Sequence, residues 1–156
     1  MGRAILTPGN FKVTMELLRV GVGKYVVLIT EQVLTELADW SSAKDQKNAM
    51  LSLLADTVPA YGPQEDNPNI CIPLKGTDGL LEFRKNAKRG TKVRVLWFYG
   101  DPTCVVCVRA FVKTFPHTPP DEIAAASDEK RLYFDALAHR SLKIEEALHL
   151  VRRKSR

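Results

Sequence analysis

The sequence predicts an α+β fold. A small curved antiparallel sheet, built from an N-terminal strand and a three-stranded meander, carries a helical hairpin on one face and is followed by C-terminal helices. The chain has 156 residues, which suits one domain with one core. Runs rich in β-branched and aromatic residues alternate with segments whose apolar residues recur at helical spacing. With 45% hydrophobic and 26% charged residues, the composition excludes disordered and fibrous proteins.

Residues 1–23 are expected to form an N-terminal extension. Their pattern is weak and contains the breakers Pro8 and Gly9, so they are either loose or include a short helix over residues 14–19. Residues 25–30, YVVLIT, then predict the first strand because β-branched and aromatic side chains favour extended backbone.

A helical hairpin is expected after this strand. Thr30 is a suitable N-cap, and apolar residues continue at helical spacing as far as residue 40. Ser41 and Ser42 end this helix, and Asp45 begins a second one whose apolar residues reach residue 54. Two amphipathic helices with a short break between them typically pack as a hairpin.

The C-terminal half predicts a loop, three strands and two helices. Residues 58–79 contain four prolines and three glycines, which indicates a loop with one short extended piece over 70–74. Short connectors between the next runs favour an antiparallel meander of strands 80–85, 93–99 and 104–113. Thr118 is expected to cap a helix that runs to about His139, and Ser141 to begin a last amphipathic helix. The expected organisation is therefore one domain over residues 24–139, with a basic C-terminal helix or tail over residues 140–156.

Positive charge is concentrated in the meander. The formal net charge is +5, and residues 75–113 hold nine basic and three acidic side chains, while residues 152–156 add four basic ones. A localised basic field attracts anionic partners. The alternative is a solvated, lysine-rich surface without a ligand.

Alternation along the strands predicts which side chains share a face. In the second meander strand the arginine Arg94 lies on one face with Leu96 and Phe98, and the other face is Val93, Val95, Trp97 and Tyr99. In the third strand the expected apolar face is Val106, Val108, Ala110 and Val112, opposite Val105, Cys107, Arg109, Phe111 and Lys113. Arginines among aromatic rings suit nucleic acid, because guanidinium pairs with phosphate and rings stack on bases. An edge strand kept soluble by its charges is the alternative.

Cysteines and common enzyme motifs offer no catalytic centre. The three cysteines are an odd number, so they imply no disulfide framework and fit a reducing cytosol. Cys104 and Cys107 resemble a CxxC motif, but residues three apart in a strand face opposite sides and no second ligand pair follows. The sequence contains no phosphate-binding loop, nucleophile elbow or dinucleotide fingerprint. It also contains neither a signal-peptide core nor an apolar run of about 18–20 residues that a membrane span needs.

Four motifs in order resemble the RelE/ParE toxin superfamily, and most closely its HigB-like, phage-derived branch. They are Leu81-Glu-Phe-Arg84, the strand 93–99 (VRVLWFY), Ala110-Phe-Val-Lys113, and His117-Thr-Pro-Pro-Asp-Glu-Ile123. The resemblance covers roughly residues 24–139 and implies a curved antiparallel sheet with a helical hairpin on one side. Two departures stand out: Thr114 replaces a second basic residue after Lys113, and Pro116 stiffens the segment that leads to His117.

The resemblance implies the toxin of a type II toxin–antitoxin pair that cleaves mRNA in the ribosomal A site without a metal or small-molecule cofactor. Carried over position by position, the expected catalytic residues are Arg84, Arg94, Lys113 and His117. Arg89, Lys92, Tyr99 and Arg109 are the expected RNA-binding residues. Histidine suits proton transfer because its ordinary pKa lies near neutrality.

The resemblance also implies a cognate antitoxin, the ribosome and mRNA as partners, and a cytoplasmic location in a bacterium, with the protein encoded by the bacterium or a phage. Two other functions stay open at this point. One is inhibition of DNA gyrase in the manner of ParE, which shares the fold without using the basic cluster for catalysis. The other is a non-toxic descendant that serves as a protein-binding module.

Overall fold

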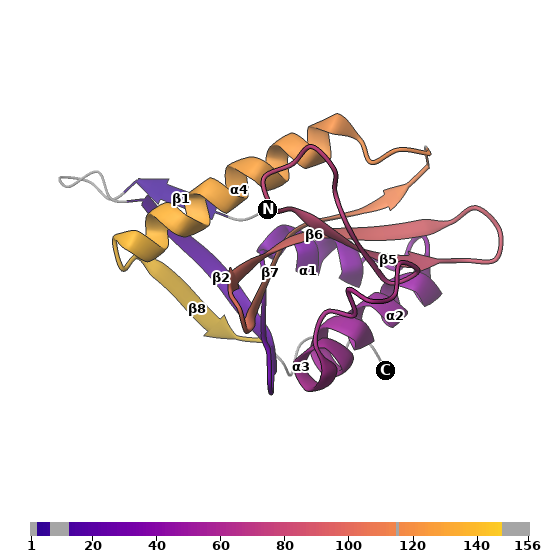
Figure 1. The fold of residues 1–156 in the computed structure, drawn as a ribbon, viewed down its shortest axis with the longest axis horizontal. Coiled ribbons are helices and arrows are strands. Elements are labelled where there is room, and N and C mark those ends of the chain that lie inside the picture. The colour runs from indigo at the N-terminus through magenta and orange to yellow at the C-terminus, as the bar shows by residue number, and fades with distance from the viewer. Residues whose placement is uncertain (1–2, 7–12, 115, 148–156) are drawn as a thin grey trace.

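A computed structural model describes residues 3–6, 13–114 and 116–147 and confirms the α+β prediction (Figure 1). Seven strands follow the order β1-β2-β3-β7-β6-β5-β4, and β8 pairs with β2 beside this path. The strands are β1 (Arg3–Leu6), β2 (Val13–Val22), β3 (Val26–Ile29), β4 (Cys71–Pro73), β5 (Leu81–Asn86), β6 (Lys92–Asp101), β7 (Cys104–Lys113) and β8 (Leu142–Glu146). The predicted meander is β5-β6-β7, which is antiparallel throughout.

Both ends of the described chain join this sheet, which corrects two expectations. The segment that was expected to be loose or helical over residues 14–19 lies inside the ten-residue strand β2. The last helix, expected from Ser141, is instead the strand β8 over residues 142–146; residues 148–156 of the expected basic tail lie outside the described residues. The sheet is also mixed, since β3 pairs with β7 and β2 pairs with β8 in parallel.

The helical hairpin is longer than predicted. It comprises α1 (Glu31–Ala38), α2 (Lys44–Ser52), a π-helical turn over Leu53–Thr57 and α3 (Val58–Tyr61), so the expected loop begins only after residue 61. Pro59 has no N–H to donate to the preceding helical turn. The π-helical turn over Leu53–Thr57, which is wider than an α-helical turn, precedes this missing hydrogen bond. Thr30 caps α1 as predicted, because its Oγ1 accepts a hydrogen bond from the N–H of Val33.

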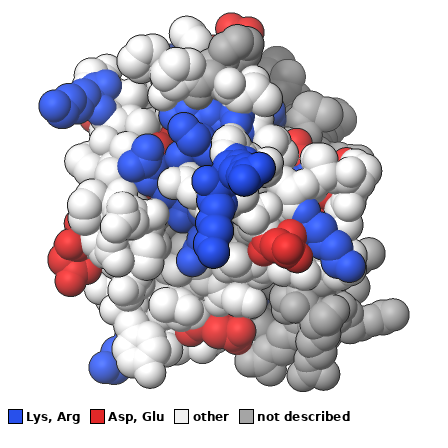
Figure 2. All heavy atoms as spheres, turned by 90° about the vertical axis from the view of Figure 1, so that its right-hand side faces the viewer, with Lys and Arg blue, Asp and Glu red and all other residues white. Residues whose placement is uncertain are grey.

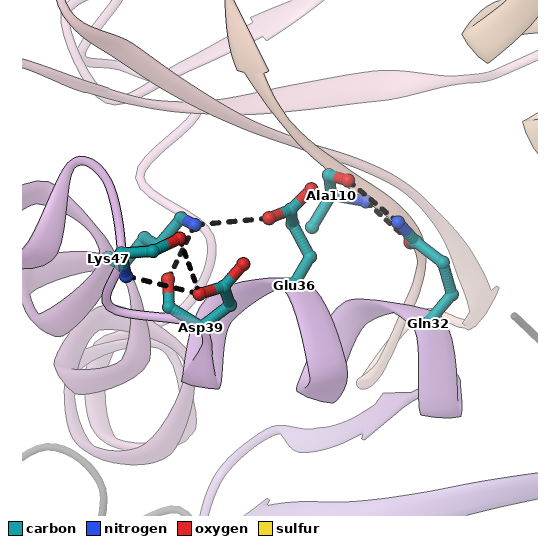
Figure 3. Close-up of polar contacts among 6 residues, drawn as sticks. Gln32, Glu36, Asp39, Lys47 and Ala110 are labelled. Carbon is teal, nitrogen blue, oxygen red and sulfur yellow. Dashed lines mark hydrogen bonds and ion pairs between the residues drawn. The ribbon is translucent and has the colours of Figure 1, made fainter.

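Polar side chains fasten the hairpin to itself and to the sheet (Figure 3). Lys47 is fully buried, and its Nζ donates to Glu36 Oε2 at 3.0 Å and to the carbonyl of Asp39 at 2.7 Å. The strand β3 ends at Ile29, so it does not reach Ala110 of β7; the Gln32 side chain accepts from the Ala110 N–H and donates to its carbonyl instead. These contacts satisfy buried polar groups that would otherwise destabilise the fold.

Helices cover both faces of the sheet, and each face has its own core. The hairpin covers the face of Phe83 and Trp97, whose rings stack at 4.8 Å. The helix α4 (Pro120–Ala138) covers the opposite face, where Tyr133 meets Phe98 edge to face. Close packing reaches the backbone, since a Cβ on Gly21 of β2 would lie 2.4 Å from Cγ of Pro59.

A bulge in β7 corrects the predicted face of that strand. Leu96 of β6 pairs with Arg109, but the next residue, Trp97, pairs with Cys107. The extra residue, Val108, reverses the alternation. Val106 and Val108 therefore lie in the α4 core with Phe111, whereas Val105 and Cys107 lie in the hairpin core with Ala110. Cys104 and Cys107 do lie on opposite faces, as predicted.

Candidate functional site

A hollow of about 310 Å³ lies where the meander, the strand β4 and the segment after β7 meet. Three of the four residues predicted to be catalytic line it, namely Arg84, Lys113 and His117. The remaining lining residues are Ile72, Leu74, Lys75, Glu82, Pro116, Thr118 and Ile123. Figure 2 shows lysine and arginine side chains gathered on the side of the molecule that carries the β5–β6 turn. The hollow therefore combines a cationic rim with aliphatic walls.

Glu82 is the carboxylate at the centre of this site. It is only 1% exposed, and its Oε2 lies 3.6 Å from Nε of both Arg84 and Arg94. Its Oε1 accepts a hydrogen bond from Thr118 Oγ1 at 2.7 Å. One buried carboxylate thus joins β5, β6 and the segment that carries His117.

Arg94 lies beneath the hollow and does not line it. Its side chain is 1% exposed, and one guanidinium nitrogen donates to Asn86 Oδ1 at 2.7 Å and to the carbonyl of Val93 at 3.1 Å. Burial lowers the pKa of the Arg94 guanidinium, Glu82 opposes that effect, and the charge of Arg84 adds to it. Because Arg84 and Arg94 are cross-strand partners, Glu82 offsets the repulsion between them.

Arg84 is more accessible than Arg94. Its side chain is 27% exposed, and it donates to the carbonyl of Pro68 at 3.2 Å. Arg84 lines the hollow, and its guanidinium has five N–H donors, more than its contacts with Glu82 and Pro68 engage. A planar guanidinium in this position suits a phosphate.

Lys113 supplies a second cation to the hollow, at the end of β7. It is 5% exposed and pairs across the sheet with Lys92. Burial lowers the pKa of the Lys113 ammonium; Glu82 raises it, while Arg94, Arg84 and Lys92 lower it further. The charged ammonium can bind an anion, and its lowered pKa makes it a better proton donor than an ordinary lysine.

His117 is exposed and lies between β7 and α4. The expectation that Thr118 caps α4 is wrong, because the cap residue is Pro119 and the Thr118 hydroxyl is bound to Glu82. This hydrogen bond ties the residue next to His117 to the floor of the hollow. The strand end at Lys113 and the helix start at Pro120 hold the segment at both ends.

The four residues predicted to bind RNA are divided among three places. Arg89 lies on the exposed turn between β5 and β6, and Lys92 begins β6 beside Lys113. Nε of Arg109 donates to Glu122 Oε1 of α4 at 2.7 Å. Tyr99 points to the hairpin face, where its hydroxyl donates to Glu65, and burial raises its pKa. Arg109 and Tyr99 do not line the hollow.

The site residues predicted from the sequence include neither Glu82 nor Lys75, although both line the hollow. Glu82 could have been found, because it lies two residues before Arg84 and therefore on the same face of β5. Lys75 lies in the loop after β4 and has no signal in a single sequence.

The described residues contain no group of three or more His, Cys, Asp or Glu side chains that could hold a metal ion. The three cysteines are free and buried, and burial raises the pKa of Cys104 to about 11 and of Cys71 to about 12. Among the described helices, none has the length and apolar composition to cross a membrane.

Comparison with known proteins identifies a family for this chain. No curated protein and no solved structure is significantly similar to this chain. A family profile described as "Phage derived protein Gp49-like (DUF891)" matches residues 38–131. This range runs from the end of α1 into α4 and includes every residue named in the candidate site. Since the match covers more than half of the chain, the protein belongs to the phage-derived Gp49-like family, a toxin-like family of the RelE type.

Proposed function

We propose that this protein is the toxin of a type II toxin–antitoxin system, of the HigB-like branch, and that it inhibits translation by cleaving mRNA on the ribosome. The observation that carries the proposal is the convergence of Arg84, Lys113 and His117 on one hollow, above the buried carboxylate of Glu82. These three side chains come from β5, from β7 and from the segment after β7, so only the folded chain brings them together.

The proposed reaction uses the RNA itself as the nucleophile. The 2′-oxygen attacks the adjacent phosphorus, the bond to the 5′-oxygen breaks, and the products are a 2′,3′-cyclic phosphate and a 5′-hydroxyl. A base removes the 2′-hydroxyl proton, and an acid delivers a proton to the departing 5′-oxygen. Negative charge grows on the phosphate oxygens in the transition state, so cations placed there before the reaction lower the barrier.

Arg84 and Lys113 are the proposed phosphate ligands, because both line the hollow and each offers several donors. His117 is the proposed proton-transfer group. Arg94 is assigned an indirect role: it is buried beneath the hollow and acts through Glu82. Arg89 and Lys92 extend the positive surface along the β5–β6 turn and are proposed to contact the RNA backbone. Arg109 and Tyr99 have no role in this proposal, since Glu122 and Glu65 engage them away from the hollow.

The proposed partners are the ribosome with its mRNA and an antitoxin protein, with which toxins of this family type normally pair. These partners place the proposed site of action in the cytoplasm. No metal ion or small-molecule cofactor enters the proposed reaction.

The test is to express the protein with and without the neighbouring gene and to map RNA 5′ ends. Growth arrest with new 5′-hydroxyl ends inside codons is expected, together with protection by the neighbouring gene. Lys113→Met and Arg84→Gln should each abolish these ends, whereas Lys24→Met, at an exposed lysine on the β2–β3 turn, should not. Arrest with intact mRNA would contradict the proposal, and lost supercoiling in the same cells would favour gyrase inhibition. Harmless expression would favour a protein-binding module.

A further inference from the structure

Among the described residues, no strand pairs with the outer edge of β8, at one end of the sheet. This strand pairs with β2 over Leu142–Glu146, opposite the edge on which β2 pairs with β1 and β3. The carbonyl of Ser141 accepts a hydrogen bond from the N–H of Met15, and the N–H of Ala147 donates one to the carbonyl of Arg19. The odd-numbered residues of β8 therefore direct their N–H and C=O groups to β2. Alternation along a strand turns the N–H and C=O of Leu142, Ile144 and Glu146 to the outer edge.

Charged side chains usually protect an edge strand from pairing, and β8 carries three of them in five residues, so a partner must match these charges. The described residues place no further strand on this edge. Its central residue, Ile144, is apolar and 47% exposed. Arg19 of β2 neutralises Glu146 at 2.5 Å, whereas Lys143 and Glu145 are exposed and make no ion pair with a described residue.

We infer that this edge binds a second copy of the same chain, with two β8 strands pairing antiparallel about a two-fold axis at Ile144. Ile144 then faces the partner's Ile144 as a hydrogen-bonded pair, and Leu142 faces the partner's Glu146. Lys143 faces the partner's Glu145, and by symmetry Glu145 faces the partner's Lys143. The strand sequence Leu-Lys-Ile-Glu-Glu is thus complementary to itself in charge.

Charge selects this register over its two neighbours. The residues whose backbone groups point outward are even-numbered, and they must pair with each other across the interface. Even residues then face even ones and odd residues face odd ones, so the two-fold axis must pass through a residue. The nearest alternatives are therefore axes at Lys143 and at Glu145. An axis at Lys143 would place two lysines face to face, and an axis at Glu145 would place two glutamates face to face. Only the axis at Ile144 makes every cross-strand charge pair attractive.

The inferred contact is small, so the dimer is expected to be reversible. It joins two sheets end to end at β8, whereas the hollow lies beside β4 and β5, at the other end of the strand order. Dimerisation would therefore leave the hollow open. The inference is independent of what that hollow does.

Sedimentation equilibrium at concentrations up to about 1 mM, where small interfaces assemble, tests the inference. Lys143→Glu and Glu145→Lys should each weaken the dimer about tenfold or more, because symmetry makes each substitution act in two pairs. A mixture of these two variants should form a heterodimer, and the double exchange Lys143→Glu with Glu145→Lys should dimerise like the parent. Lys24→Glu, the same charge change on the β2–β3 turn, should leave dimerisation unchanged.

Recovery in the mixture would also show that each variant is folded. A parent chain that stays monomeric over the whole concentration range would overturn the inference, as would a mixture that shows no heterodimer.

Cysteine cross-linking tests the register directly. The Cα atoms of a hydrogen-bonded antiparallel pair are about 5.5 Å apart, which a disulfide can span. Oxidised Ile144→Cys should therefore form a covalent dimer, whereas Lys143→Cys should not, because its two copies would be diagonal neighbours at about 7–8 Å. The three native cysteines are buried and can remain. Preferential cross-linking of Lys143→Cys would contradict the register.

Discussion

Substitution of Glu82 by glutamine is the most informative perturbation of the candidate site. Glutamine has the same shape and can still accept the hydrogen bond from Thr118, so the change removes little more than the charge. That charge is 1% exposed and lies 3.6 Å from Nε of Arg94, which is itself 1% exposed. Removal of one partner from a buried ion pair costs about 3–5 kcal/mol, because the other charge is left buried without compensation.

The expected result is a free energy of unfolding about 3–5 kcal/mol lower in Glu82→Gln than in the parent, measured by urea denaturation. For a chain of this length, each kcal/mol shifts the melting temperature by about 2–4 °C, so the melting temperature should fall by about 6–20 °C. The double variant Glu82→Gln with Arg94→Met should recover most of this loss, because it removes the uncompensated charge together with its partner.

Asp128→Asn is the matched control. It removes one carboxylate from the Arg131–Asp128 ion pair, whose side chains are 75% and 64% exposed, so it should cost at most about 1 kcal/mol. The reasoning is refuted if Glu82→Gln costs no more than this control, or if the double variant is less stable than Glu82→Gln alone.

Three further predictions concern the site and its supports. Thr118→Val removes the hydroxyl bound to Glu82 and should lower RNA cleavage in the expression assay. Thr118→Ser, which keeps the hydroxyl, should retain cleavage, and Thr114→Val, at an exposed position between β7 and α4, should have no effect. Equal loss of cleavage in both valine variants would contradict a specific role for this hydrogen bond. Lys113 binds its proton less firmly in the folded state than its ordinary pKa of 10.5 implies, so the unfolded chain holds more protons between the two values and stability should rise with pH in that window. Lys113→Met should lack this component of the rise in urea titrations as the pH approaches 10.5, and identical slopes in the two proteins would show that the folded environment does not disfavour the charged lysine. Gly21→Ala should destabilise the fold by about 1–3 kcal/mol, because its Cβ would lie 2.4 Å from Cγ of Pro59. Val22→Ala, at an exposed neighbouring position, is the control. Equal thermal stability of the two variants would mean that α3 can shift without losing stability.

Local pattern was sufficient for much of the fold. The strand at residues 25–30, the N-cap at Thr30 and the meander were predicted because runs of valine and aromatic residues and a capping hydroxyl act within a few residues of chain. The order of the meander strands was predicted in the same way, whereas the meeting of Arg84, Lys113 and His117 in one hollow depends on how the folded strands pair.

Pairing between distant segments decided the remainder. The residues of β8 have helical spacing in the sequence, yet they are extended because they pair with β2, more than a hundred residues away along the chain. The bulge at Val108 changed the faces of β7, since one extra residue reverses every position beyond it.

The roles of individual charges were likewise beyond the sequence. The sequence by itself determined that cations gather on the meander. Only the tertiary structure decided that Arg94 lies buried on Glu82, that Glu122 engages Arg109, and that Tyr99 faces the hairpin. The physical reason is that burial and ion pairing depend on which carboxylate the fold brings within a few ångströms, and that distance is a property of the packed molecule.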